Sequence, residues 1–275
     1  MKVAALQMVS SPSVAANLGV ARQLIGQASD AGAELAVLPE YFCFMGLKDT
    51  DKLAIAEQAG HGPLQDFLGH CASDFNLWVV GGTIPLATDP LGEVSGKVYN
   101  SSLVYNPAGQ CVARYDKMHL FRFDNGLESY DEARVLLPGA QPVAFDLPSR
   151  DGHSYRVGLS ICYDLRFPEL YRKLAADGAD LLLVPSAFTH TTGQMHWEVL
   201  LRARAIENLA YVLAAAQGGL HENQRRTWGH SMAVDPWGKI LAEQDQGPAV
   251  VLANIDKAHL TAKRTQLPAL DHRRL

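Results

Sequence analysis

Short apolar runs recur along the chain and alternate with segments in which apolar residues return at helical spacing. The first run covers residues 2–8, and residues 14–31 then carry apolar positions three or four residues apart, at Leu18, Ala21, Leu24, Ile25 and Ala28. Short apolar runs bounded by turn residues are typical of buried strands, whereas the second spacing is typical of an amphipathic helix. The alternation of the two predicts an α/β protein.

The remaining elements are predicted in the same way. Further apolar runs predict strands at 35–40, 77–84, 157–162, 181–184 and 210–213. Asn106-Pro107-Ala108-Gly109 predicts a hairpin turn between strands at 99–105 and 110–115. Helices are predicted at 196–209 and, in two pieces, within 48–75. Residues 116–156 are predicted to be irregular, with one hairpin near Pro142.

The second half of the chain repeats the element order of the first. Residues 31–42 align with 177–188, residues 102–109 with 231–238, and the opening strand 3–8 with 157–162. A duplication of this kind predicts one domain, residues 1–275, with internal pseudo-twofold symmetry. Each half would supply a mixed sheet with helices on one face, and the two sheets would pack together as an α-β-β-α sandwich.

Composition and charge exclude several classes of function. The chain has 275 residues, a formal net charge of -5 and a sequence pI of about 6.0, which does not favour nucleic acid as a partner. No apolar stretch approaches the length of a membrane span. The four cysteines are widely spaced, which favours neither a zinc site nor a disulfide scaffold and is typical of a reducing cytoplasm.

Candidate catalytic residues stand at the ends of predicted strands. Cys162 ends a core strand just before a predicted helix, which is where open α/β sheets bind ligands. Glu40 ends another strand, Lys117 follows a hairpin strand, and Glu128 lies in the loop between Lys117 and Cys162. A thiol needs a base or a nearby cation to act as a nucleophile, and a lysine can stabilise an oxyanion. The set predicts acyl transfer at a carbon–nitrogen bond.

Each of these residues also has a structural interpretation. A free cysteine is most often a small buried hydrophobic residue. Glu40 fits a carboxylate at the rim of a sheet, and Lys117 fits a surface lysine beside Asp116. Spacing alone therefore leaves the triad open.

Three sequence blocks resemble the signature motifs of the nitrilase, or carbon–nitrogen hydrolase, superfamily. They are Leu38-Pro39-Glu40, residues 115–121 (YDKMHLF) and residues 161–169 (ICYDLRFPE). Further blocks that resemble the Nit branch of this superfamily are Glu128-Ser129 with Leu137-Pro138-Gly139, Pro185-Ser186-Ala187-Phe188, Thr192-Gly193, residues 196–208 and residues 229–238. The resemblance covers essentially the whole chain, in the order of the family.

The resemblance implies a role for each of these residues. Cys162 would be the nucleophile, Glu40 the general base and acid, and Lys117 the oxyanion donor together with the backbone N–H of Tyr163. Glu128 would be a second glutamate that orients Lys117 and the substrate nitrogen. The family fold is the same α-β-β-α sandwich, it usually dimerises, and it needs no cofactor or metal.

The resemblance also bears on the substrate. Residues 42–46 and 196–238 resemble the deaminated glutathione amidases of the Nit branch, whose relatives, the ω-amidases, hydrolyse amides of 2-oxo dicarboxylates. We therefore expect a small anionic amide and water as the reactants. Carboxylate-binding candidates are Arg122, Arg166 and Arg226, although surface or ion-pair roles are favoured for all three. Phe188 and Thr192 are candidate pocket residues. Residues 121–126 (FRFDNG) depart from the commoner Nit pattern.

Other functions remain open at this stage. A thiol hydrolase could use His119 or His230 as its base, but the local motifs of papain-like and caspase-like enzymes are missing. A non-catalytic, partner-binding member of the fold is a second alternative. Within the superfamily, an ω-amidase, a nitrilase, an N-carbamoyl amidase or an amide-to-amide transferase remain possible.

Overall fold

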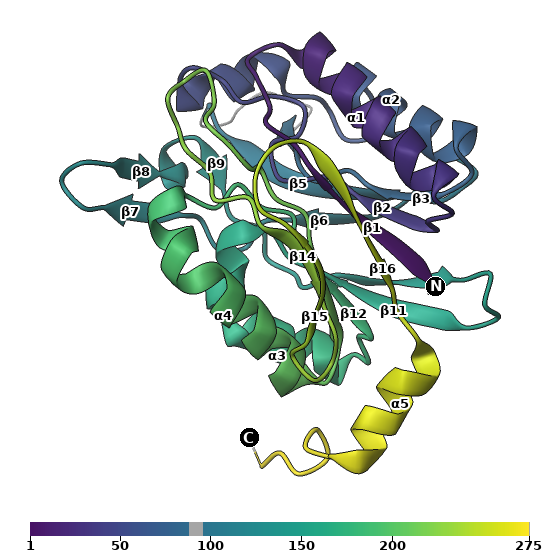
Figure 1. Cartoon of the computed structure of the whole chain (residues 1–275). Helices are drawn as coiled ribbons and strands as arrows, with labels where there is room; N and C mark the ends of the chain where they lie inside the picture. Colours follow the sequence, from purple (N-terminus) through teal and green to yellow (C-terminus); the bar gives the residue numbers. More distant parts are fainter. Residues whose placement is uncertain (88–95, 275) are drawn as a thin grey trace.

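Four layers of secondary structure make up the protein, in the order helix, sheet, sheet, helix (Figure 1). The computed structural model describes residues 1–87 and 96–274. Helices α1 (Val14–Asp30) and α2 (Pro63–Asp74) cover the outer face of one sheet, whereas α3 (Pro168–Ala176) and α4 (His190–Asn208) cover the other. The predicted α-β-β-α sandwich is confirmed.

The first sheet is mixed and includes the last strand of the chain. Its order is β16-β1-β2-β3-β5-β4, with β6 and β9 also paired to β5. Strand β1 runs parallel to β2 and antiparallel to β16, and β3 is antiparallel to β5. The strands are β1 (Lys2–Gln7), β2 (Leu35–Val37), β3 (Trp78–Val80), β4 (Ile84–Ala87), β5 (Val98–Tyr105), β6 (Cys111–Asp116), β9 (Leu136–Leu137) and β16 (Ala249–Asn254).

The second sheet repeats the strand directions of the first. Its order is β10-β11-β12-β13-β14-β15, in which β11, β12 and β13 are mutually parallel and the outer strands are antiparallel to their neighbours. The equivalent path in the first sheet is β16-β1-β2-β3-β5-β6. The strands are β10 (Ala144–Pro148), β11 (Ser154–Leu159), β12 (Leu181–Leu183), β13 (Tyr211–Ala214), β14 (Ser231–Val234) and β15 (Ile240–Gln244). The matching order supports the internal repeat inferred from the sequence.

Strand β1 explains why the central strands are apolar at nearly every position. Val3 and Ala5 point into the core between the two sheets, whereas Ala4 and Leu6 point into the core beneath α1 and α2. Because successive side chains of a strand face opposite sides, a strand covered on both sides loses its polar positions. The sandwich therefore follows from the uninterrupted apolar runs.

Two predicted elements differ from the structure. The strand predicted at 77–84 is split into β3 and β4, because Gly82 adopts a φ of 47°. A Cβ at Gly82 would lie 2.0 Å from the carbonyl oxygen of Pro39, so only glycine allows this close approach. The hairpin predicted near Pro142 is formed slightly later in the chain: Pro142 precedes β10, and the turn that joins β10 to β11 lies at residues 149–153.

Residues 116–156 contain more regular structure than predicted. The short strands β7 (Arg122–Asp124) and β8 (Ser129–Asp131) form a separate hairpin, visible at the edge of the molecule in Figure 1. The other short elements are the 3-10 helices η1 (Asp49–Ile55), η2 (Glu132–Arg134) and η3 (Cys162–Arg166), and the chain ends with helix α5 (Lys257–Gln266). Among the described residues, no helix has both the length and the apolar character needed to cross a bilayer.

Candidate active site

Three buried reactive side chains lie just beyond strand ends. Glu40 follows β2 of the first sheet and Lys117 follows β6, whereas Cys162 follows β11 of the second sheet. Glu40 and Lys117 are 1% and 0% exposed, and Cys162 is 7% exposed. Since the two sheets face each other, residues that are far apart in the sequence meet at one end of the sandwich.

Glu40 is fixed by bonds from both halves of the chain. Its Oε1 accepts hydrogen bonds from Lys117 Nζ at 2.9 Å and from Asn100 Nδ2 at 2.8 Å. Its Oε2 accepts the backbone N–H of Ala187 at 2.8 Å, and its carbonyl oxygen accepts from Gln217 Nε2 at 3.1 Å. A carboxylate held on both oxygens is ready to move a proton without reorganising.

Lys117 contacts a second glutamate, but that residue is Glu132 and not Glu128. Lys117 Nζ lies 2.8 Å from Glu132 Oε2 and donates to Oε1 at 2.9 Å. Tyr41 Oη and the backbone N–H of Phe121 also donate to the Glu132 carboxylate, at 2.9 Å and 2.7 Å. Glu132 is therefore a fixed member of the site.

The expectation that Glu128 orients Lys117 is not met in the structure. Glu128 lies in the four-residue connection between β7 and β8, where its backbone N–H donates to Asn125 Oδ1. Its Oε2 accepts a hydrogen bond from the Thr191 hydroxyl at 2.9 Å. The hairpin carries Glu128 away from Lys117. The next glutamate along the chain, Glu132, is the first residue of η2 and lies beside Lys117.

Cys162 is the first residue of η3 and occupies the sharp backbone turn that follows β11. Its φ is 48°, in the left-handed region that is uncommon for residues other than glycine. The turn is held by the buried carboxylate of Asp164, which accepts from the Ile161 N–H at 2.9 Å, from Tyr115 Oη at 2.7 Å and from the His119 N–H at 3.0 Å. Strain of this kind persists only where the surrounding structure enforces it, and it is concentrated at functional sites.

Burial and neighbouring charges set the protonation of Lys117, Glu132 and Cys162. Burial lowers the pKa of Lys117, but the carboxylates of Glu132 and Glu40 outweigh this effect, so the pKa is raised and the ammonium stays charged. Burial raises the pKa of Glu132, but Lys117 outweighs it and holds this pKa below its usual value. Burial raises the pKa of the Cys162 thiol well above its usual value, and Glu40 raises it further. The thiol is therefore neutral at neutral pH and needs a base to react.

A small pocket of about 260 Å³ lies against these residues. Cys162, Glu40 and Glu132 contribute to it. Of the four predicted substrate-binding residues, Tyr163, Phe188 and Thr192 line it and Glu128 does not. Among the described residues, no acceptor is found for the backbone N–H of Tyr163, which follows the cysteine. The pocket thus brings the thiol, Glu40 and the Tyr163 residue to one place, and Lys117, which is not a lining residue, is bonded to the lining carboxylates of Glu40 and Glu132.

The three predicted arginines do not line this pocket, but a fourth does. Arg122 and Arg226 are exposed, whereas Arg166 packs its guanidinium 5.1 Å from the ring centroid of Phe188 and contacts His196. Arg225 lines the pocket, and its Nη2 donates to the carbonyl oxygen of Ala187 at 2.9 Å.

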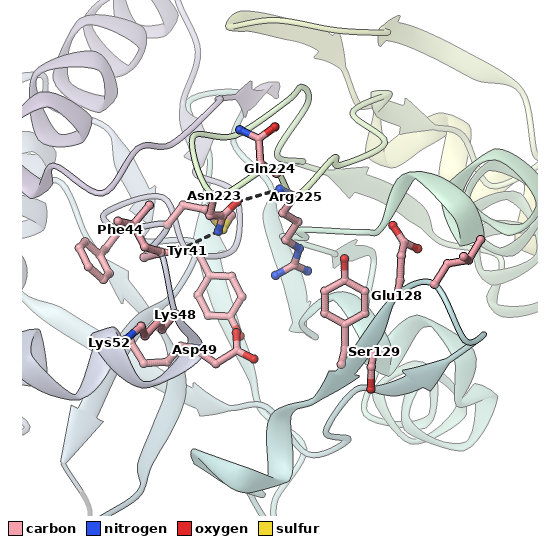
Figure 2. A pocket seen from close by; sticks show the side chains of 15 residues that line it. Tyr41, Phe44, Lys48, Asp49, Lys52, Glu128, Ser129, Asn223, Gln224 and Arg225 are labelled. Carbon is pink, nitrogen blue, oxygen red and sulfur yellow. Dashed lines mark hydrogen bonds between the residues drawn. The ribbon is translucent and has the colours of Figure 1, made fainter.

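A wider cavity adjoins the first and is shown in Figure 2. We call it the outer chamber; its volume is about 1100 Å³, including its open mouth. Lys48, Asp49 and Lys52 lie on one side of the chamber in Figure 2, Glu128 and Ser129 lie on the other, and the Arg225 guanidinium points between them. Arg225 lines both cavities, so it stands at their boundary.

The histidines proposed as alternative bases have other partners. His119 Nδ1 lies 2.7 Å from Asp164 Oδ1, and His230 Nδ1 lies 2.5 Å from Glu243 Oε1. Neither histidine is among the described residues that line the pocket at Cys162. Within the described chain, no group of three or more His, Cys, Asp or Glu side chains is arranged to hold a metal ion.

Sequence reasoning missed Asn100, Glu132 and Arg225. A signal existed for Glu132, because Asn125-Gly126 is a typical hairpin turn and places Glu128 beside that turn. Asn100 lies inside a strand and Arg225 in an irregular segment, so neither has a comparable signal.

Comparison with known proteins identifies the family to which the chain is similar. The sequence model of the family described as carbon-nitrogen hydrolase matches residues 2–265. A protein of Synechocystis named deaminated glutathione amidase is 44% identical over 98% of this chain and 97% of its own length. The omega-amidase NIT2-B of Xenopus laevis is 35% identical over 99% of this chain and 95% of its length. The NitFhit protein of C. elegans superposes with a TM-score of 0.87 and 36% identity, covering 99% of this chain and 65% of that one.

Proposed function

This chain belongs to the carbon–nitrogen hydrolase family, and we propose that it is an amidase whose substrate is deaminated glutathione. The products would be 2-oxoglutarate and the dipeptide Cys-Gly. One observation carries the proposal: a strained cysteine, buried and neutral, shares one small pocket with Glu40, next to the ammonium of Lys117. That arrangement suits acyl transfer through a thioester.

In the first half-reaction, Glu40 removes the proton from the Cys162 thiol as the sulfur attacks the amide carbonyl carbon. A carbon–sulfur bond forms, and the carbonyl electrons move to the oxygen. Lys117 Nζ and the backbone N–H of Tyr163 stabilise this oxyanion. When the carbonyl reforms, the carbon–nitrogen bond breaks and Glu40 gives its proton to the departing amine.

In the second half-reaction, Glu40 removes a proton from water as the water oxygen attacks the thioester carbon. The carbon–sulfur bond then breaks, the carboxylic acid forms, and Glu40 returns the proton to the thiolate. Glu132 keeps Lys117 in place through both steps, with bonds of 2.8 Å and 2.9 Å between the two side chains. We place Glu132 in the role that the family resemblance assigned to Glu128.

The choice of substrate rests on the degree of similarity. The relative named deaminated glutathione amidase is 44% identical, against 35% for the one named omega-amidase. An ω-amidase acting on 2-oxoglutaramate is therefore the second candidate. The other activities of the superfamily and a non-catalytic role have no observation in their favour.

We also propose that the protein works as a homodimer in the cytoplasm. Three apolar side chains of α4, Met195, Val199 and Ile206, are 69%, 67% and 47% exposed, and a second copy would cover them. All four cysteines are free, which is compatible with a reducing compartment.

The test compares hydrolysis of deaminated glutathione and 2-oxoglutaramate by the wild type, Cys162→Ala and Cys111→Ala. The wild type is expected to prefer deaminated glutathione, Cys162→Ala to lose activity on both substrates, and Cys111→Ala to retain it. Preference for 2-oxoglutaramate would favour the ω-amidase. Activity that survives in Cys162→Ala would overturn the mechanism.

A further inference from the structure

The proton that Glu40 gives to the departing nitrogen determines on which side of the scissile bond the amine half of a substrate leaves. This carboxylate must protonate the departing nitrogen, so the amine half has to lie on the Glu40 side of the scissile bond. The next residue, Tyr41, lines the outer chamber, and its hydroxyl donates to Glu132 Oε1 at 2.9 Å. The outer chamber also meets the pocket that holds Glu40 at Arg225, which lines both, so it offers space next to that pocket for a leaving group.

The volumes of the two cavities favour the same division of the substrate. Pockets that bury a drug-sized molecule enclose about 300–1,000 Å³. The pocket at Cys162 leaves only about 10 Å³ accessible to the centre of a water-sized molecule, far below this range, so a dipeptide amine needs additional space. The outer chamber supplies it, because its volume on the same measure is about 450 Å³ and lies within this range.

Two cations at the chamber have unused donors. The Nε of Arg225 is buried and has no hydrogen-bond partner among the described residues. Lys52 is half-buried, its Nζ lies 4.5 Å from the ring centroid of Tyr41, and no carboxylate lies within ion-pair distance of it in the described chain. Buried donors are almost always satisfied, so unused ones indicate an anionic ligand.

We propose that the outer chamber binds the amine half of the amide substrate, and that Lys52 and Arg225 select a leaving group that carries a carboxylate. This inference rests on the proposed function and deepens it. Deaminated glutathione and 2-oxoglutaramate share the same acyl group and differ only in the amine, so the chamber discriminates between them. Ammonia leaves no group in the chamber, whereas Cys-Gly extends its carboxylate toward Lys52.

The decisive variant is Lys52→Met, with Lys173→Met on the exposed face of α3 as the matched control. In Lys52→Met, kcat/KM for deaminated glutathione should fall about tenfold, mainly through KM, since a charge-assisted hydrogen bond is lost. The value for 2-oxoglutaramate should fall by much less, and Lys173→Met should match the wild type for both. An equal loss for both substrates, or no loss for either, would overturn the inference.

A second measurement changes the substrate instead of the chamber. Deaminated glutathione with its C-terminal carboxylate converted to a carboxamide should react about tenfold less efficiently with the wild type, and this difference should disappear in Lys52→Met. If the wild type treats the two forms equally, the inference fails while the proposed function stands. If the wild type hydrolyses neither deaminated glutathione nor 2-oxoglutaramate, the proposed function itself fails and the inference falls with it.

Discussion

Replacing Glu132 by glutamine removes one charge from the buried centre and keeps the shape of the side chain. The wild-type carboxylate accepts from Lys117, Tyr41 and the Phe121 N–H. An amide has only one acceptor oxygen, so its NH₂ group must face at least one of these donors. Lys117 would then keep Glu40 as its single carboxylate partner.

The size of the effect follows from the burial of this pair. Lys117 is 0% exposed, and removing one partner of a buried ion pair costs about 3–5 kcal/mol. If about 3 kcal/mol of this cost appears in the transition state, where Lys117 must hold an oxyanion, kcat should fall about 10²-fold. KM should change much less, because Glu132 acts by orienting Lys117, and Lys117 stabilises the oxyanion that forms only during the reaction.

The assay is steady-state hydrolysis of 2-oxoglutaramate by Glu132→Gln, with Glu128→Gln as the matched control, because the ammonia half of this substrate does not occupy the chamber that Glu128 lines. Glu128 makes one side-chain hydrogen bond, to Thr191, so its variant should retain activity within about threefold. Thermal unfolding of both variants separates loss of folding from loss of chemistry. The assignment would be refuted if Glu128→Gln lost as much activity as Glu132→Gln, or if Glu132→Gln remained nearly fully active.

Two further outcomes are expected. Asp164→Asn should lower kcat about tenfold or more and reduce the melting temperature, because the carboxylate that fixes the Cys162 turn accepts from Ile161, Tyr115 and His119; unchanged kcat in a folded variant would contradict this. Burial raises the pKa of the Cys43 thiol to about 12. In the unfolded chain this thiol loses its proton from about pH 8.5, whereas in the folded protein it keeps the proton. The free energy of unfolding should therefore fall as pH rises above about 8.5, by about 1.4 kcal/mol per pH unit up to pH 12. Urea unfolding from pH 8 to 11 should therefore show a shallower decline in Cys43→Ala than in the wild type, and equal slopes would refute it.

The sequence supported the prediction of the fold because both sheets are covered on both faces. Runs such as Leu35–Leu38 had to be apolar throughout, and the repeated order of elements gave the layer arrangement. The break at Gly82 was not predictable, because it depends on the carbonyl of Pro39 arriving from a distant part of the chain. Contacts of this kind are set by tertiary packing and leave little trace in local pattern.

In the candidate site too, some residues could be predicted from local pattern and others could not. Cys162, Glu40 and Lys117 follow strands, and strand ends can be found from hydrophobic pattern. Glu132 was missed because a hairpin and a 3-10 turn, and not a strand, decide which glutamate meets Lys117. Arg225 was missed because one position in an extended segment separates a lining residue from the exposed Arg226.

The pairing of β16 with β1 has a consequence for the synthesis of the protein. Lys2 lies opposite Asn254, and the pairing continues to Gln7 opposite Ala249, so one edge of β1 lacks this partner until residues 249–254 have left the ribosome. Unpaired strand edges are templates for aggregation during slow folding. A nascent chain that stops before β16 should therefore present this edge to chaperones or to other chains, and refolding after denaturation should be limited by closure of this most distant contact.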